Sequence, residues 1–200
     1  MVVVNLVRVG ARACLVEVED AVTAASLATW ARESGPAADE IVPAATTVLF
    51  DGVDPAEVAA ALPHWSRDAP PARGPVVRVP VTYDGPDLEA VAAHWGCSAD
   101  EVVALHTSLE LVALFSGFAP GFSYLSGLPA ERSVPRLESP RARVAPGSVA
   151  LADTWCGIYP SASPGGWLVV GTTDVVLWDA DLPQPALLAP GTRVRFEVAG

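Results

Sequence analysis

The sequence contains no lysine, and all twelve basic residues among its 200 residues are arginine. A chain without lysine cannot supply a Schiff-base nucleophile, the ammonium group of a phosphate-binding P-loop, or an attachment site for biotin. We therefore expect no cofactor to be bound by this chain. Any chemistry with ATP or biotin must then take place on a partner subunit.

Positive charge is scarce in general. The chain has 23 acidic residues against 12 basic ones, which gives a formal net charge of −11. Affinity for nucleic acids comes largely from clustered lysine and arginine side chains that displace counterions from the phosphates. The composition therefore argues against nucleic acid as a ligand.

Long apolar runs are also lacking. None approaches the roughly 20 residues of a membrane span, and the amino-terminal residues lack the basic region and cleavage site of a signal peptide. We expect a cytoplasmic protein with no membrane association.

The three cysteines, Cys14, Cys97 and Cys156, form no C-x-x-C pair and are expected to be reduced thiols. His64 and His94 have no partner at metal-ligand spacing, so no metal site is predicted.

The composition, 51% hydrophobic and 18% charged, suits a globular protein with a sizeable core. In the first third, strand-like runs alternate with helical ones, and Asp54-Pro55-Ala56-Glu57 is a typical helix start. A stretch of three prolines and one glycine at residues 68–75 has no hydrophobic periodicity and predicts a linker. We therefore expect two domains, residues 1–72 and 73–200.

The second part begins with a predicted strand at residues 76–81 and two helices, the second opened by Ser98 and Glu101 in a capping box. Short apolar runs separated by glycine and proline then predict an all-β barrel or sandwich. The predicted strands are residues 111–115, 148–152, 167–171, 175–178 and 193–198. The expected fold class is α+β.

Three segments of the second part are dense in glycine, proline and aromatic residues: 117–129, 134–141 and 157–167. With Leu105-His106-Thr107 and the segment 190–196, they form an ordered set that resembles the PxpB/KipI family. This family is also called allophanate hydrolase subunit 1, and it includes the small subunit of bacterial 5-oxoprolinase. The likeness extends over roughly residues 76 to 196.

This resemblance implies a small α+β amino-terminal domain followed by a cyclophilin-like antiparallel β-barrel. It also implies partner subunits of the PxpC/KipA and PxpA types, which together with this chain open 5-oxoproline to glutamate at the expense of ATP. The chain would then be the non-ATP-binding subunit, inactive alone. Two alternatives stay open: a KipI-like inhibitor of a sensor histidine kinase, and a carboxyltransferase component acting on a urea- or allophanate-like substrate.

The motifs suit a small amide or carboxylate held in an apolar cleft. Aromatic rings supply rigid walls, guanidinium groups match a carboxylate, and glycine lets backbone amides approach a ligand. Each of these residue types also has an ordinary structural use: aromatic residues in a core, arginine in surface salt bridges, and glycine in tight turns. The candidate substrate-binding residues are Arg136, Arg141, Tyr159, Phe122, Tyr124 and Gly166.

His106 is the motif residue whose side chain ordinarily titrates near neutral pH, so it is the candidate catalytic proton carrier. Its alternative role is to cap the helix that ends near it. Phe118, Pro120 and Phe122 are the predicted partner interface. Cys156 is interpreted as an inert buried thiol, because no base is paired with it in the sequence. We expect the three motifs to converge, with His106, on one cleft at a mouth of the barrel.

Three positions depart from the family pattern. Trp155 and Cys156 stand where the family usually has Gln-Thr, and Thr172 stands where it has arginine. A buried polar group without its partner costs about 1–3 kcal/mol of recognition. The resemblance therefore leaves the substrate open.

Overall fold

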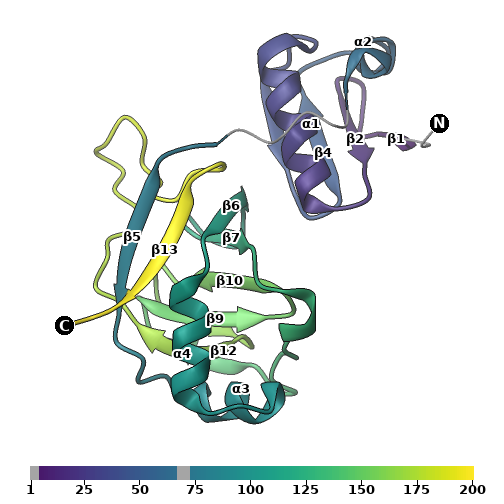
Figure 1. Cartoon of the computed structure of the whole chain (residues 1–200). Helices are drawn as coiled ribbons and strands as arrows, with labels where there is room; N and C mark the ends of the chain where they lie inside the picture. Colours follow the sequence, from purple (N-terminus) through teal and green to yellow (C-terminus); the bar gives the residue numbers. More distant parts are fainter. Residues whose placement is uncertain (1–4, 67–72) are drawn as a thin grey trace. The chain divides into compact units, whose positions relative to one another are not determined.

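The protein is described from a computed structural model, which places residues 5–66 and 73–200. The chain divides into two compact units, Met1–Arg73 and Gly74–Gly200, and each is described by itself (Figure 1). Most of the predicted linker, residues 68–72, lies outside the described residues.

The first unit is a four-stranded antiparallel sheet with one long helix packed against it. Its strand order is β1 (Asn5–Arg8), β2 (Ala13–Glu17), β4 (Thr47–Asp51) and β3 (Glu40–Pro43). The helices are α1 (Ala21–Ser34), α2 (Pro55–Ala61) and the 3-10 turn Leu62–His64. The Asp54 side chain accepts a hydrogen bond from the Ala56 amide at 2.9 Å, so the helix start read from the sequence is confirmed.

The second unit is a seven-stranded, nearly closed, barrel-like sheet, which confirms the expected α+β class. Its strands in spatial order are β12 (Leu168–Thr172), β9 (Ser148–Ala152), β10 (Trp155–Ile158), β7 (Ser123–Ser126), β6 (Leu111–Ser116), β13 (Arg193–Val198) and β5 (Val76–Val81). The pairs are antiparallel except β13 with β5, which run side by side in Figure 1. An antiparallel bridge between Thr82 and Thr172 joins the two edges of the sheet.

Two helices and a separate two-stranded ribbon complete this unit. The helices are α3 (Leu88–Trp95) and α4 (Ala99–Ser108), and the ribbon pairs β8 (Arg141–Val144) with β11 (Ser163–Gly165). A 3-10 turn covers Ala130–Arg132. The Ser98–Glu101 capping box at the start of α4 is confirmed. No helix in the described ranges is long and apolar enough to span a membrane.

The sheet of the second unit is covered on both faces, and alternation along the strands shows this directly. In β9, Val149 and Leu151 belong to the large barrel core, whereas Ala150 and Ala152 belong to a smaller aromatic cluster. In β12, Val169 likewise joins the aromatic cluster, while its two neighbours join the barrel core. The barrel therefore has an inner face and an outer face, and each buries a different set of side chains.

The structure differs from the expected strands in two ways. Residues 175–178 form no strand and contribute one isolated bridge, Trp178 with Ala186. Conversely, β7, β8, β10 and β11 are not among the strands expected from the sequence. Pairing with neighbours distant in sequence, rather than local preference, determines these short strands.

Candidate functional site

A small pocket of about 110 Å³ lies on the outer face of the barrel. It brings together residues from all three motifs. The lining residues are Phe118, Phe122, Tyr124, Arg136, Tyr159, Gly165, Gly166 and Trp167. Five of the six predicted substrate-binding residues are among them, and so is Phe118 of the predicted interface.

The pocket walls are aromatic rings packed edge to face. The ring of Phe122 is central, with its centroid 5.6 Å from that of Tyr159 and 5.5 Å from that of Trp167. Close ring packing is possible because β10 carries Gly157, where an added Cβ would lie 2.7 Å from Cζ of Phe122. Rings held in this way form a rigid apolar surface that needs no ordering when a ligand binds.

Tyr159 is the polar group at the base of this cage. Its residue is 2% exposed, and burial raises the pKa of its phenol, while a backbone hydrogen bond from Trp167 and the charges of Arg136 and Arg141 act in the opposite direction. The hydroxyl is therefore neutral at neutral pH and can donate a hydrogen bond. Gly165 makes its position possible, because a Cβ there would lie 2.3 Å from the Tyr159 Oη.

Arg136 supplies positive charge at the exposed side of the pocket. Its guanidinium carbon lies 6.0 Å from the centroid of the Trp167 ring, a cation–π distance. Stacking on an aromatic face holds the planar guanidinium without using its hydrogen-bond donors. Arg136 can therefore offer a bidentate contact to a carboxylate in the pocket.

Arg141 does not line the pocket but lies close to it. It pairs in the ribbon with Gly165, a pocket residue, and its Nη2 donates to Oδ1 of Asp87 at 2.7 Å. Asp87 is 6% exposed and also accepts from the Val169 amide at 2.7 Å. The expected carboxylate-binding arginine is therefore already engaged in an ion pair through one of its nitrogens.

His106 does not join the other predicted site residues. It is fully buried inside the barrel, where its ring stacks on Phe196 with centroids 4.4 Å apart. Nδ1 lies 2.6 Å from the Tyr83 hydroxyl and Nε2 lies 3.4 Å from Sγ of Cys156.

Burial lowers the pKa of His106 from 6.5 to about 4, so the imidazole is neutral at physiological pH. Its position inside the barrel gives it no contact with the pocket on the outer face, and its catalytic role stays a prediction. Burial raises the pKa of the Cys156 thiol, so it is protonated and a poor nucleophile.

The predicted interface residues separate into exposed and buried ones. Phe118 is 59% exposed and Pro120 is exposed, whereas Phe122 is 2% exposed. The ring centroid of Phe122 lies 5.3 Å from that of Phe118. Phe118 also has φ +68°, a strained conformation for a residue other than glycine. Phe122 therefore belongs to the buried pocket wall, and Phe118 lies at the exposed rim of the pocket.

More exposed apolar side chains lie beside this loop. Gly121 approaches the backbone of residues 177–178 so closely that a Cβ would lie 2.8 Å from Cβ of Trp178. Trp178 is 41% exposed. Further along the same segment, the exposed residues Val176, Leu182 and Leu187 line one hollow, and we call these three residues the apolar patch. Such patches are commonly binding surfaces.

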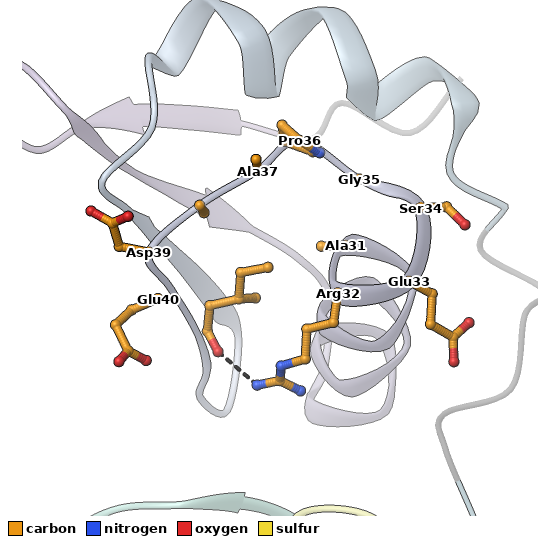
Figure 2. Close-up of a pocket in the computed structure, with 11 residues that line it drawn as sticks. Ala31, Arg32, Glu33, Ser34, Gly35, Pro36, Ala37, Asp39 and Glu40 are labelled. Carbon is orange, nitrogen blue, oxygen red and sulfur yellow. Dashed lines mark hydrogen bonds between the residues drawn. The ribbon is translucent and has the colours of Figure 1, made fainter.

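A larger hollow of about 490 Å³ lies in the first unit, between the end of α1 and β3. Figure 2 shows that the Glu33 side chain points away from those of Asp39 and Glu40, so these carboxylates do not converge. The Arg32 guanidinium donates to the Ile41 carbonyl at 2.6 Å. With its polar groups diverging or engaged, this hollow is the weaker candidate.

Two residues that matter at the pocket, Trp167 and Asp87, are not among the candidates from the sequence. Trp167 lies within the third motif, and the density of glycine and aromatics there was the available signal. Asp87 marks only the start of a helix when the sequence is considered alone. Nothing local in the sequence connects it with Arg141, 54 residues away.

Comparison with known proteins supports the family resemblance drawn from the motifs. The model of the family described as carboxyltransferase domain, subdomain C and D, matches residues 4–188. A relative from Escherichia coli O157:H7, named as a subunit of 5-oxoprolinase, is 47% identical over 123 residues, which are 60% of this chain and 56% of the relative. One of the same name from Bacillus subtilis (strain 168) is 41% identical over 124 residues, 60% of this chain and 52% of the relative. The matched region thus spans about half the length of these relatives.

Solved structures show the same fold. The protein designated TTHA0988 superposes with a TM-score of 0.76 at 34% identity, covering 94% of this chain and 40% of that chain. A conserved uncharacterized protein from Pyrococcus horikoshii, PH0987, has a TM-score of 0.59 at 28% identity and is covered over 97% of both chains. The Kluyveromyces lactis urea carboxylase has a TM-score of 0.66 at 17% identity, with 98% of this chain and 22% of that chain covered. The last likeness concerns the fold alone.

Proposed function

The chain belongs to the carboxyltransferase domain family, subdomains C and D, and on this premise we propose that it is the non-ATP-binding subunit of an ATP-dependent 5-oxoprolinase. The proposed reaction opens 5-oxoproline to glutamate. The observation that carries the proposal is the aromatic pocket with Arg136 and Tyr159, in a chain 47% identical over 123 residues to a protein named as a 5-oxoprolinase subunit.

The pocket chemistry fits a small cyclic amide that bears a carboxylate. Its volume of about 110 Å³ is well below the roughly 300–1,000 Å³ of drug-sized sites, so it suits a compact metabolite. The rings of Phe122 and Trp167 would cover the apolar carbons of the ligand. Arg136 would bind the carboxylate, and the neutral Tyr159 phenol would donate a hydrogen bond to the amide carbonyl.

The division of labour follows from the absence of lysine. A chain without lysine has no P-loop ammonium and no biotin attachment site, so ATP or biotin would be handled by subunits of the PxpC/KipA and PxpA types. The exposed Phe118 beside the pocket suits a surface that a partner covers. On this proposal the partner completes the pocket, and this chain alone has no turnover.

Two other functions would use the same features differently. A kinase inhibitor would need the apolar patch but not the pocket. A carboxyltransferase component acting on a urea- or allophanate-like substrate would hold that substrate in the pocket in place of 5-oxoproline. Loss of function on changing Arg136 therefore separates the first proposal from the kinase inhibitor, and turnover of 5-oxoproline separates it from the carboxyltransferase.

The test is reconstitution of the complex with PxpA- and PxpC-type subunits, followed by measurement of glutamate formed from 5-oxoproline and ATP. We expect turnover only when this chain is present together with its partners. The variant Phe118→Asp should weaken association with the PxpC-type subunit about 30-fold or more, the effect of losing a hot-spot residue. Val198→Asp, at an exposed residue outside the patch, serves as the matched control. Turnover by the chain alone, or equal turnover without it, would refute the proposal.

A further inference from the structure

Asp87 is a buried carboxylate whose position the helix start alone does not explain. It precedes α3 at the N-cap position, yet its side chain makes no capping hydrogen bond. Instead Oδ2 accepts from the Val169 amide of β12, and Oδ1 accepts from Nη2 of Arg141 in β8, each at 2.7 Å. Burying a carboxylate is costly unless it is paired and hydrogen-bonded. These two contacts therefore fix both the carboxylate and the arginine that it binds.

Arg141 has a second nitrogen that is not used in this way. Its Nη1 is buried and has no hydrogen-bond partner within the part of the chain that the structure describes. A buried donor left unsatisfied costs about 1–3 kcal/mol, and more when the group is charged. A guanidinium held through Nη2, with Nη1 left free, is preorganised to receive an acceptor oxygen from a ligand.

Arg141 is adjacent in the ribbon to a residue of the aromatic pocket. Arg141 is the strand partner of Gly165, which lines the pocket and is in turn in close contact with the Tyr159 hydroxyl. The charge of Arg141 acts on Tyr159, where it opposes the rise in pKa caused by burial. The guanidinium is thus near enough to the pocket for its charge to act on groups inside it.

We infer that Asp87 is a positioning residue: it holds Arg141 by Nη2 so that Nη1 is available to the carboxylate of a small ligand in the aromatic pocket. The inference rests on the proposed function, because it requires that the pocket bind a carboxylate. It adds a specific claim, that the preference for a carboxylate over a neutral amide depends on a residue outside the pocket.

The experiment measures equilibrium binding of L-5-oxoproline and of its neutral carboxamide to the reconstituted complex without ATP. Asp87→Asn keeps the size of the side chain but removes the charge that holds Arg141. We expect it to weaken 5-oxoproline binding at least tenfold while changing carboxamide binding less than twofold. Asp84→Asn is the matched control, since Asp84 lies on the same segment, is exposed and accepts from Thr172 Oγ1. It should behave as the wild type.

A second variant tests the free nitrogen separately from the ion pair. Arg141→Lys keeps a positive charge to pair with Asp87, but lysine has a single terminal nitrogen where arginine has two. This variant should therefore also lose affinity for 5-oxoproline and keep its affinity for the carboxamide. This variant decides the matter if Asp87→Asn does not fold.

The possible results separate the proposed function from the role of Asp87. If the wild type does not prefer the carboxylate, the proposed function fails and the inference fails with it. If the wild type has the preference and both variants keep it, or weaken both ligands equally, the proposed function stands and Asp87 is only a structural residue.

Discussion

The buried imidazole of His106 should make the stability of the second unit depend on pH. Burial holds its pKa at about 4 in the folded protein against 6.5 for an exposed histidine. Between these values the unfolded chain binds a proton that the folded chain does not, so the free energy of unfolding falls as the pH falls. A difference of this size corresponds to about 2–3 kcal/mol lost by pH 4.5, since one pKa unit is about 1.4 kcal/mol.

The assay is urea unfolding at pH values from 7.5 to 4.5, followed through amide NMR signals of the second unit. His106→Gln isolates the contribution, because glutamine does not titrate. This variant should be less stable than the wild type at pH 7.5, having lost the stacking on Phe196, and the gap should narrow by about 2–3 kcal/mol toward pH 4.5. His94→Gln, changed at an exposed histidine, should follow the wild type. If the difference in unfolding free energy between His106→Gln and the wild type stays constant with pH, burial does not lower the pKa of His106.

Two further predictions follow from burial and close contact. Gly165→Ala should displace Tyr159 and destabilise the second unit, because the added Cβ would lie 2.3 Å from the Tyr159 hydroxyl. Gly166→Ala, whose added Cβ would lie 3.6 Å from Pro140, should cost little stability. An equal loss of stability in both variants, measured by urea unfolding, would contradict this. A thiol reagent should modify Cys97 rapidly in the native chain, and the two buried cysteines only after denaturation. The measurement is the number of thiols that react before and after denaturation. Rapid reaction of all three cysteines in the native chain would contradict the structure.

Local signals in the sequence predict what depends on local interactions. The Asp54 cap and the Ser98–Glu101 capping box involve residues two or three apart, and both are present. The motif set predicts the fold class and most of the pocket, because the aromatic and glycine residues of the motifs pack on one another. Strand β10 escapes prediction, since Trp155-Cys156-Gly157-Ile158 becomes a strand only by pairing with β9 and β7.

The position of His106 could not be read from its motif. Whether a histidine near the end of a helix faces solvent or the core depends on what packs against that helix, and here the partners are Phe196, Tyr83 and Cys156, each from a different strand or loop. The ion pair of Asp87 and Arg141 has the same character. Contacts between residues so far apart in sequence form only when the barrel is assembled.

On the proposed function, the aromatic pocket binds the carboxylate of 5-oxoproline through Arg136. The most direct measurement is the KM for 5-oxoproline of the reconstituted complex carrying Arg136→Gln. Loss of a charge-assisted hydrogen bond, about 1.5–3 kcal/mol, predicts that KM rises about 10- to 100-fold, with kcat changed much less. An unchanged KM, in a complex that assembles and turns over normally, would show that Arg136 does not bind the substrate carboxylate.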